Sequence, residues 1–277
     1  MFMCQYCAKY GNGHKWYLNP ENFTEEIFKS HRVQTARVVE MLGGPEKMNF
    51  ELGAAEAIDS MLPNLHDQDA LDKLNELVAE QLHGGQVIPL EDALKIVDLT
   101  KGIILIPCYC RKYFGGIEKM TCMFLYPVSE MVPKMRPWEK CEKLTPEAAK
   151  AYLREFDKLG YVHSVYWAPI PVPIVICNCE YPYCIGLKGR INYGVMNAAR
   201  KSEYICVVDP DKCDGCGGEP KCSKRCFFGA IKYAPSLQKV IVSPTECFGC
   251  GVCRAVCDRG AMKLIERAQF VSLKDEF

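Results

Sequence analysis

The sequence predicts a mixed fold of helices and strands, of the α/β class in the broad sense that includes α+β. Helical patterns alternate with short apolar strands in the first two thirds of the chain, the last third contains two similar halves, and 18 of the 277 residues are cysteine. Hydrophobic residues make up 49% of the chain and charged residues 25%, which is enough apolar surface for a substantial core. We therefore expect a globular protein whose cysteines determine its chemistry.

Charge and hydropathy exclude several function classes. The 34 Lys and Arg residues balance the 34 Asp and Glu residues, which argues against a nucleic-acid partner. Residues 160–179 are long enough to span a membrane, but Pro169, Pro171 and Pro173 favour an extended segment, so no membrane-spanning helix is expected. The first residues lack the pattern of a secretion signal. A cytoplasmic location is therefore expected, where thiols stay reduced and dense cysteine indicates metal binding or redox chemistry.

The regular elements can be placed from apolar periodicity. The expected helices occupy 24–42, 69–83, 90–99 and 146–159, and the expected strands occupy 103–106 and 174–176. The helix at 146–159 has the clearest ends. Thr145 is a favoured N-cap, Pro146 a favoured first residue and Gly160 a favoured residue just after a helix.

Each expected strand leads into a Cys-x-Cys pair, Cys108 with Cys110 and Cys177 with Cys179. Side chains two residues apart in a strand point to the same face, so each pair directs both sulfur atoms to one side if its strand continues. If the two strands are parallel neighbours, both pairs emerge at the carboxyl edge of the sheet, where such sheets place ligands.

The last third of the chain contains two runs of four cysteines. The first run is Cys213, Cys216, Cys222 and Cys226, and the second is Cys247, Cys250, Cys253 and Cys257. Each half is expected to form a strand, a ligand loop, a short helix and a second strand. Closely spaced thiolates suit soft metal centres such as iron–sulfur clusters. Cys-x2-Cys pairs also bind zinc, but the duplication of the whole pattern favours iron–sulfur clusters.

The duplicated pattern resembles the bacterial-type ferredoxin with two [4Fe–4S] clusters, in which the fourth cysteine of each run binds the other cluster. The resemblance implies a βαββαβ-like fold. It also implies one cluster held by Cys213, Cys216, Cys222 and Cys257 and another held by Cys247, Cys250, Cys253 and Cys226. Two departures occur: Phe227 and Asp258 replace the usual proline, and five residues separate the second and third cysteines of the first run.

Six further cysteines lie in the middle of the chain: Cys108, Cys110, Cys122, Cys177, Cys179 and Cys184. Over about residues 86–266 the sequence is similar to a group of anaerobe proteins that join a Cys-x-Cys-Arg module to a C-terminal ferredoxin domain. That resemblance implies this domain architecture and no particular reaction. We expect at least one further iron–sulfur cluster that draws on both Cys-x-Cys regions, with Arg111 beside it favouring the reduced state. Buried structural thiols are the alternative.

The remaining cysteines carry weaker predictions. Cys4 and Cys7 form a Cys-x2-Cys pair that, with the six middle cysteines, gives enough thiols for two extra four-ligand sites. A zinc corner or free thiols are equally compatible with that pair. Cys206 and Cys141 are expected to be packing or incidental thiols, and His163 a structural histidine.

These observations divide the chain into a mostly helical N-terminal region with the Cys-x2-Cys pair (1–85), a cysteine-rich α/β module (86–200) and a dicluster ferredoxin domain (201–277). The expected function is electron transfer in a subunit of an anaerobic oxidoreductase complex rather than in a stand-alone enzyme. Expected partners are redox proteins such as a flavoprotein or a metalloenzyme subunit. The alternative is a catalytic iron–sulfur reductase or cofactor activator that uses an open-site cluster in the module.

Overall fold

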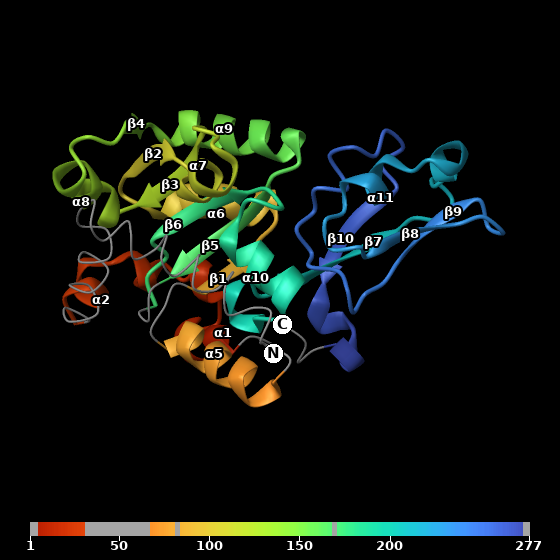
Figure 1. Cartoon of the computed structure of the whole chain (residues 1–277), viewed down its shortest axis with the longest axis horizontal. Helices are drawn as coiled ribbons and strands as arrows, with labels where there is room; N and C mark the ends of the chain where they lie inside the picture. Colours follow the sequence, from red (N-terminus) through yellow and green to blue (C-terminus); the bar gives the residue numbers. More distant parts are fainter. Residues whose placement is uncertain (1–4, 31–66, 81–83, 168–170, 274–277) are drawn as a thin grey trace.

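The computed structural model describes residues 5–30, 67–80, 84–167 and 171–273. It places a six-stranded sheet with its helices at one end of the molecule and two small two-stranded sheets at the other (Figure 1). All of the strand pairs are antiparallel, so the fold is α+β. None of the helices in the described ranges combines the length and the apolar character that a membrane crossing requires.

The large sheet interleaves strands from distant parts of the chain. Its order is β1 (Gly84–Val87), β5 (Val162–Trp167), β6 (Val175–Cys179), β3 (Met120–Leu125), β2 (Ile103–Pro107) and β4 (Glu142–Leu144). The expectation of parallel neighbouring strands at 103–106 and 174–176 is wrong, because β3 lies between β2 and β6 and is antiparallel to both. Since β2 and β6 therefore run in the same direction, their carboxyl ends still share one edge of the sheet, and β3 begins there.

The two Cys-x-Cys pairs differ in local structure. Cys177 and Cys179 lie within β6 and continue the strand, as expected. The first pair does not continue its strand, because β2 ends at Pro107 and Cys108 becomes the N-cap of a helix that contains Cys110. Strand pairing thus orients one pair and the first turn of a helix orients the other.

Three expected helices are confirmed as α5 (Gln68–Glu80), α6 (Leu90–Leu99) and α9 (Pro146–Leu159), and α2 (Glu25–Ser30) is the described part of a fourth. The structure adds four helices that the sequence analysis did not expect: α1 (Gln5–Tyr10), α7 (Tyr109–Gly115), α8 (Val128–Met135) and α10 (Ile185–Tyr193). At α9 the Thr145 hydroxyl accepts a hydrogen bond from the Ala148 N–H at 3.2 Å, and Gly160 takes a left-handed φ of 88°. The expected helix at 24–42 is seen as α2, and its remainder lies outside the described residues, as does 81–83 of the helix expected at 69–83.

Apolar side chains cover both faces of the large sheet. On one face Leu105, Met123 and Ile176 pack with residues of α6 and α9 and with the N-terminal Trp16 and Tyr17, which are fully buried. A second core on the other face contains the cysteines at the sheet edge and reaches the C-terminal part of the chain. The cysteines therefore lie where the module meets the last third of the chain.

In the C-terminal part the first strand along the chain pairs with the last, and the two strands between them in the sequence pair with each other. β7 (Tyr204–Val208) pairs with β10 (Met262–Glu266), and β8 (Ile231–Ala234) pairs with β9 (Lys239–Val242). The expected short helix forms in the first half as α11 (Lys221–Arg225), after an extended Pro220. In the second half the expected helix is wrong: the chain makes turns there, after Gly251 at a left-handed φ of 83°.

Candidate metal centres

The first candidate centre is a cavity lined by four cysteines of the C-terminal part. Cys213, Cys216, Cys222 and Cys257 all line a cavity of about 210 Å³. Cys213 accepts a hydrogen bond from the Val240 N–H at 3.5 Å, and Cys257 accepts one from the Ala261 N–H at 3.3 Å. Backbone N–H groups directed at sulfur atoms stabilise thiolates, so these four cysteines fit as ligands of a soft metal centre.

The second candidate centre contains Cys226, Cys247, Cys250 and Cys253. Cys247 accepts hydrogen bonds from the Cys206 N–H at 3.3 Å and the Gly249 N–H at 3.4 Å. Burial, followed by the neighbouring charge of Cys253, raises the pKa of the Cys250 thiol well above its ordinary value. Mutual repulsion of this kind is relieved when thiolates bind cationic iron, so these residues also fit an iron–sulfur cluster.

Gly249 shows why the second loop needs glycine. Its φ is 65°, and a Cβ at this position would lie 2.1 Å from the carbonyl oxygen of Tyr204. The loop can therefore press against β7 only without a side chain. This approach brings the Cys247 sulfur within hydrogen-bond distance of the β7 backbone.

The six middle cysteines form a closed ring of thiol contacts, which we call the six-cysteine ring. Each thiol shifts the pKa of the next one in the order Cys108, Cys110, Cys184, Cys179, Cys177 and Cys122, and Cys122 in turn affects Cys108. β3 and β6 place Cys122 directly opposite Cys177, and Cys184 is the N-cap of α10. The structure thus brings together all six residues that the sequence singled out in the module.

Two thiols of the ring have a lowered pKa. Hydrogen bonds from Cys110 and then from Cys122 lower the pKa of Cys108 to about 2. Hydrogen bonds from Cys110 and Cys179 hold the pKa of Cys184 well below its ordinary value. Both cysteines are the N-caps of helices, Cys108 of α7 and Cys184 of α10.

Arg111 lies beside the ring, as its place after Cys110 suggested. The side chain is 1% exposed, its Nη1 donates to the Thr121 hydroxyl at 2.6 Å and its Nε donates to the Glu180 carboxylate at 3.2 Å. Burial opposes its charge, but the negative charge of Cys108 and the bond to Glu180 outweigh it, so the pKa of Arg111 is raised. A fixed positive charge thus stands next to the sulfur atoms.

The ring and the second candidate centre share one buried core. Phe248, Cys250 and Val252 pack in the same core as the ring cysteines, and the rings of Phe228 and Phe248 stack with their centroids 3.9 Å apart. The apolar contacts exclude water from the region between the two centres. No cysteine pattern in the sequence indicated this contact, because it depends on how the module and the C-terminal part pack.

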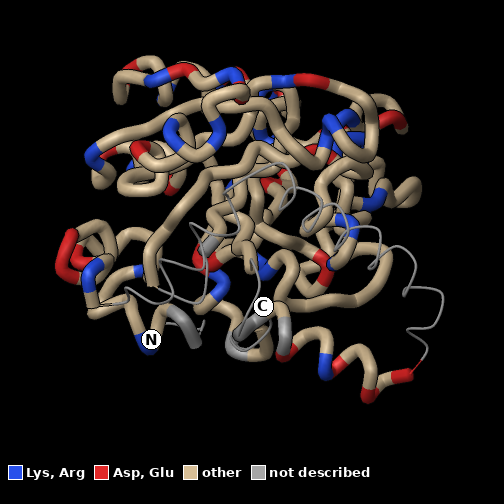
Figure 2. Tube along the Cα trace, turned by 60° about the vertical axis from the view of Figure 1, so that its left-hand side comes forward, with Lys and Arg blue, Asp and Glu red and all other residues tan. Residues whose placement is uncertain are grey.

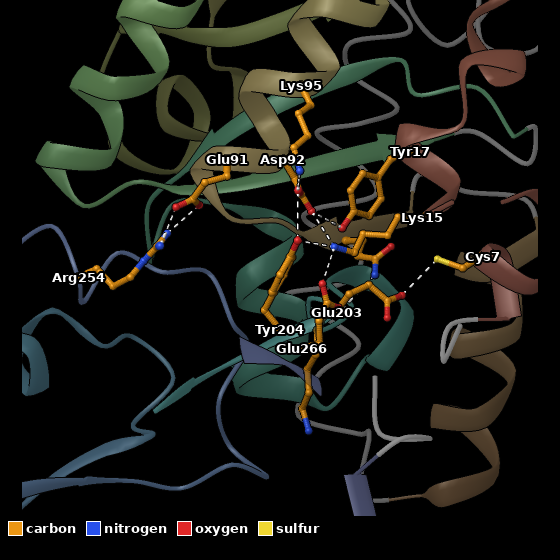
Figure 3. A network of polar contacts seen from close by, with 12 residues as sticks. Cys7, Lys15, Tyr17, Glu91, Asp92, Lys95, Glu203, Tyr204, Arg254 and Glu266 are labelled. Carbon is orange, nitrogen blue, oxygen red and sulfur yellow. Dashed lines mark hydrogen bonds and ion pairs between the residues drawn. The ribbon is translucent and has the colours of Figure 1, made fainter. Parts of the chain in front are cut away.

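Other candidate residues lie apart from the ring. Cys4 is outside the described residues, and Cys7 is buried with its thiol 3.2 Å from a Glu203 carboxylate oxygen (Figure 3). Cys206 was expected to be a packing thiol; it is buried, and its sulfur lies 3.4 Å from that of Cys253. His163 hydrogen-bonds Asn178 at 2.7 Å, and burial lowers its pKa to about 4.

Sequence reasoning missed two side chains at the ring. The Tyr166 hydroxyl lies 3.8 Å from the Cys184 sulfur, and Ser164 stands directly opposite Cys177 in the sheet. Both belong to β5, whose pairing with β6 gives no local pattern. Within the described ranges no three Cys, His, Asp or Glu side chains converge on a point that suits a single metal ion.

Comparison with known proteins supports one part of this description. No protein-family model matches the chain. Over 60 residues it is 38% identical to the polyferredoxin protein MvhB of Methanothermus fervidus, covering 19% of this chain and 15% of the relative. Over 62 residues it is 40% identical to the protein of the same name from Methanothermobacter marburgensis, covering 20% of this chain and 15% of that protein. The chain thus spans only 15% of the length of these relatives, and the matches support a ferredoxin-like iron–sulfur segment within it.

Proposed function

We propose that this protein transfers electrons through several iron–sulfur clusters as a subunit of an oxidoreductase complex. The single observation that carries the proposal is the common core of Cys250 and the ring cysteines Cys108, Cys122, Cys179 and Cys184. Separate metal sites with unrelated structural roles have no need of such contact. A relay does need it, because its centres must lie close together and away from water.

Each cluster would be held by a different set of cysteines. One [4Fe–4S] cluster would be held by Cys213, Cys216, Cys222 and Cys257, a second by Cys226, Cys247, Cys250 and Cys253, and a third by cysteines of the ring. Bound clusters of this kind would supply one-electron transfer. The chain itself holds the iron through thiolates, donates backbone N–H groups to the sulfur atoms and packs apolar side chains between the sites.

The first candidate centre is the best placed for contact with a redox partner protein. Cys216 is exposed, whereas Cys250 and most of the ring are buried. Around it, Lys221 pairs with Asp258 and Arg259 pairs with Asp214 on the surface. Figure 2 shows Lys and Arg interspersed with Asp and Glu rather than gathered on one side. Such a surface suits a partner held by a mixed polar contact more than one steered by a single sign of charge.

Metal content tests the proposal. Anaerobically purified protein is expected to contain about twelve iron and twelve sulfide ions per chain, from three [4Fe–4S] clusters. Cys250→Ser is expected to remove about four of each, because it deletes one ligand of the second centre. Cys141→Ser is the matched control, since Cys141 lies outside the three sets, and it is expected to leave the metal content unchanged. A colourless chain that contains zinc and no iron would disprove the proposal.

A change at Arg111 tests the role of the ring in redox chemistry. Arg111→Gln is expected to make the reduction potential of the ring's centre more negative, because a nearby positive charge favours the reduced state. A tenfold shift in the ratio of reduced to oxidised centre corresponds to about 59 mV, and a displacement of this order is expected. A redox titration followed by electron paramagnetic resonance measures it.

Lys112→Gln provides the control for this change. Lys112 lies next to Arg111, but its side chain is 48% exposed and pairs with Glu118 at the surface. Solvent screens exposed charges, so this substitution is expected to leave the potential almost unchanged. Equal potentials in wild type and Arg111→Gln would show that the ring holds no redox centre near Arg111.

A further inference from the structure

The six-cysteine ring contains more thiols than one cluster requires. A cube-shaped [4Fe–4S] cluster takes four cysteine ligands, which leaves two of the six for another purpose. All six sulfur atoms are free thiols in contact with their ring neighbours. The question is therefore which two of them form a separate pair.

Strand pairing distinguishes Cys122 and Cys177 from the others. They are direct partners in the antiparallel pairing of β3 with β6, and each thiol affects the pKa of the other. Direct partners in antiparallel strands have Cα atoms about 4.5–5.5 Å apart, and disulfides form at Cα separations of about 4.4–6.8 Å. The register of this pair is therefore compatible with a disulfide.

The other four cysteines form a continuous arc. Cys108, Cys110, Cys184 and Cys179 follow one another around the ring. They include Cys108 and Cys184, the N-cap residues of α7 and α10. Arg111 interacts electrostatically with Cys108 and Cys179, which are the two ends of this arc. The positive charge of Arg111 thus favours thiolates in the arc, as cluster ligands require.

The surroundings of Cys122 and Cys177 suit a pair of sulfur atoms that carries no charge in either its reduced or its oxidised state. Ser164 lies directly opposite Cys177, is fully buried, and its hydroxyl has no hydrogen-bond partner among the described residues. A hydroxyl at this place can donate to a sulfur atom without bringing charge into the core. A dithiol and a disulfide are both uncharged, so burial penalises neither of the two states.

We infer that Cys122 and Cys177 form a dithiol–disulfide couple beside a four-cysteine cluster site made of Cys108, Cys110, Cys179 and Cys184. The inference rests on the proposed function, which supplies the electron carriers. On oxidation the two S–H bonds break and one S–S bond forms, and two protons and two electrons leave. The electrons go to two one-electron acceptors of the iron–sulfur class, and the reverse reaction takes them back.

Iron content separates the pair from the arc. Full-length protein carrying Cys122→Ser or Cys177→Ser is expected to keep the iron and sulfide content of the wild type. Cys108→Ser and Cys179→Ser are expected to lose about four iron ions each, because they remove ligands. Loss of iron in Cys122→Ser or Cys177→Ser equal to that in Cys108→Ser would overturn the inference.

Peptide mapping of the wild type supplies a readout that does not depend on any variant. The protein is equilibrated anaerobically with glutathione buffers of increasing oxidation, its remaining thiols are alkylated, and its peptides are analysed by mass spectrometry. A linked pair of peptides containing Cys122 and Cys177 is expected, with the potential dependence of a two-electron couple. Absence of this link in iron-replete wild type would overturn the inference. A wild type without iron would disprove the proposed function instead, and the presence or absence of the link would still decide the couple.

Discussion

Lys15→Met is expected to lower the free energy of unfolding by about 3 kcal/mol, because it breaks a buried ion pair and leaves a carboxylate in the core. Asp92 is fully buried, and Lys15 lies 3.4 Å from its Oδ2 with a side chain that is 12% exposed (Figure 3). The Lys15 ammonium group also contacts the Tyr204 hydroxyl and lies over its ring. One side chain therefore ties the N-terminal segment to α6 and to β7.

Lys95 offers a control that uses the same carboxylate. It lies 3.2 Å from Asp92, but its side chain is 61% exposed, so Lys95→Met is expected to cost less than about 1 kcal/mol. The measurement is urea unfolding of each variant under the same anaerobic conditions. The double variant Lys15→Met with Asp92→Leu is expected to be more stable than Lys15→Met alone, since it removes the buried carboxylate that has lost its buried cation. Equal losses for Lys15→Met and Lys95→Met would contradict this account of the network.

Arg267→Ala is expected to destabilise the C-terminal part by about 4 kcal/mol and to lower its iron content. The guanidinium is fully buried and donates to three backbone carbonyl groups: Ser202 at 2.9 Å, Tyr204 at 3.1 Å and Cys247 at 2.8 Å. Removal of the side chain leaves these acceptors without their donor and opens a cavity. The loop that carries Cys247 would then lose its attachment to β7.

Arg259→Ala is the matched substitution at the surface. Arg259 pairs with Asp214 at 2.7 Å, but its side chain is 64% exposed, so a change within about 0.5 kcal/mol is expected. Unfolding in urea and the iron content of both variants measure the difference. The account of Arg267 fails if the two substitutions prove equally mild.

Local patterns predicted the local parts of the fold. Thr145, Pro146 and Gly160 act through atoms a few residues away, so the ends of α9 could be placed from sequence. The order of the sheet could not, because β3 enters between β2 and β6 through long-range pairing that leaves no periodic trace. The turns after Gly251 are a second example. A helix was expected in both halves because their cysteine spacing is the same, but Pro220 precedes this segment in the first half and Gly251 precedes it in the second.

The candidate sites follow a similar division. Cysteine spacing indicated the two C-terminal runs, and the resemblance to dicluster ferredoxins implied that the runs exchange their fourth cysteines. It also selected the six residues of the ring, although their order around it depends on β3, β6 and two helix N-caps. Ser164 and Tyr166 carried no indication at all, since a serine or tyrosine in a strand is ordinary until its partner strand is known.

The contact of Lys15 with Tyr204 also affects how the chain is made, because it joins residues 189 positions apart. A ribosome adds about 5–20 residues per second, so the interval between synthesis of these two residues is roughly 10 to 40 s. Throughout that interval Lys15 has no Tyr204 to contact and the thiol of Cys7 has no Glu203. The segment that contains Cys7 and Lys15 therefore makes these contacts only after β7 has been translated.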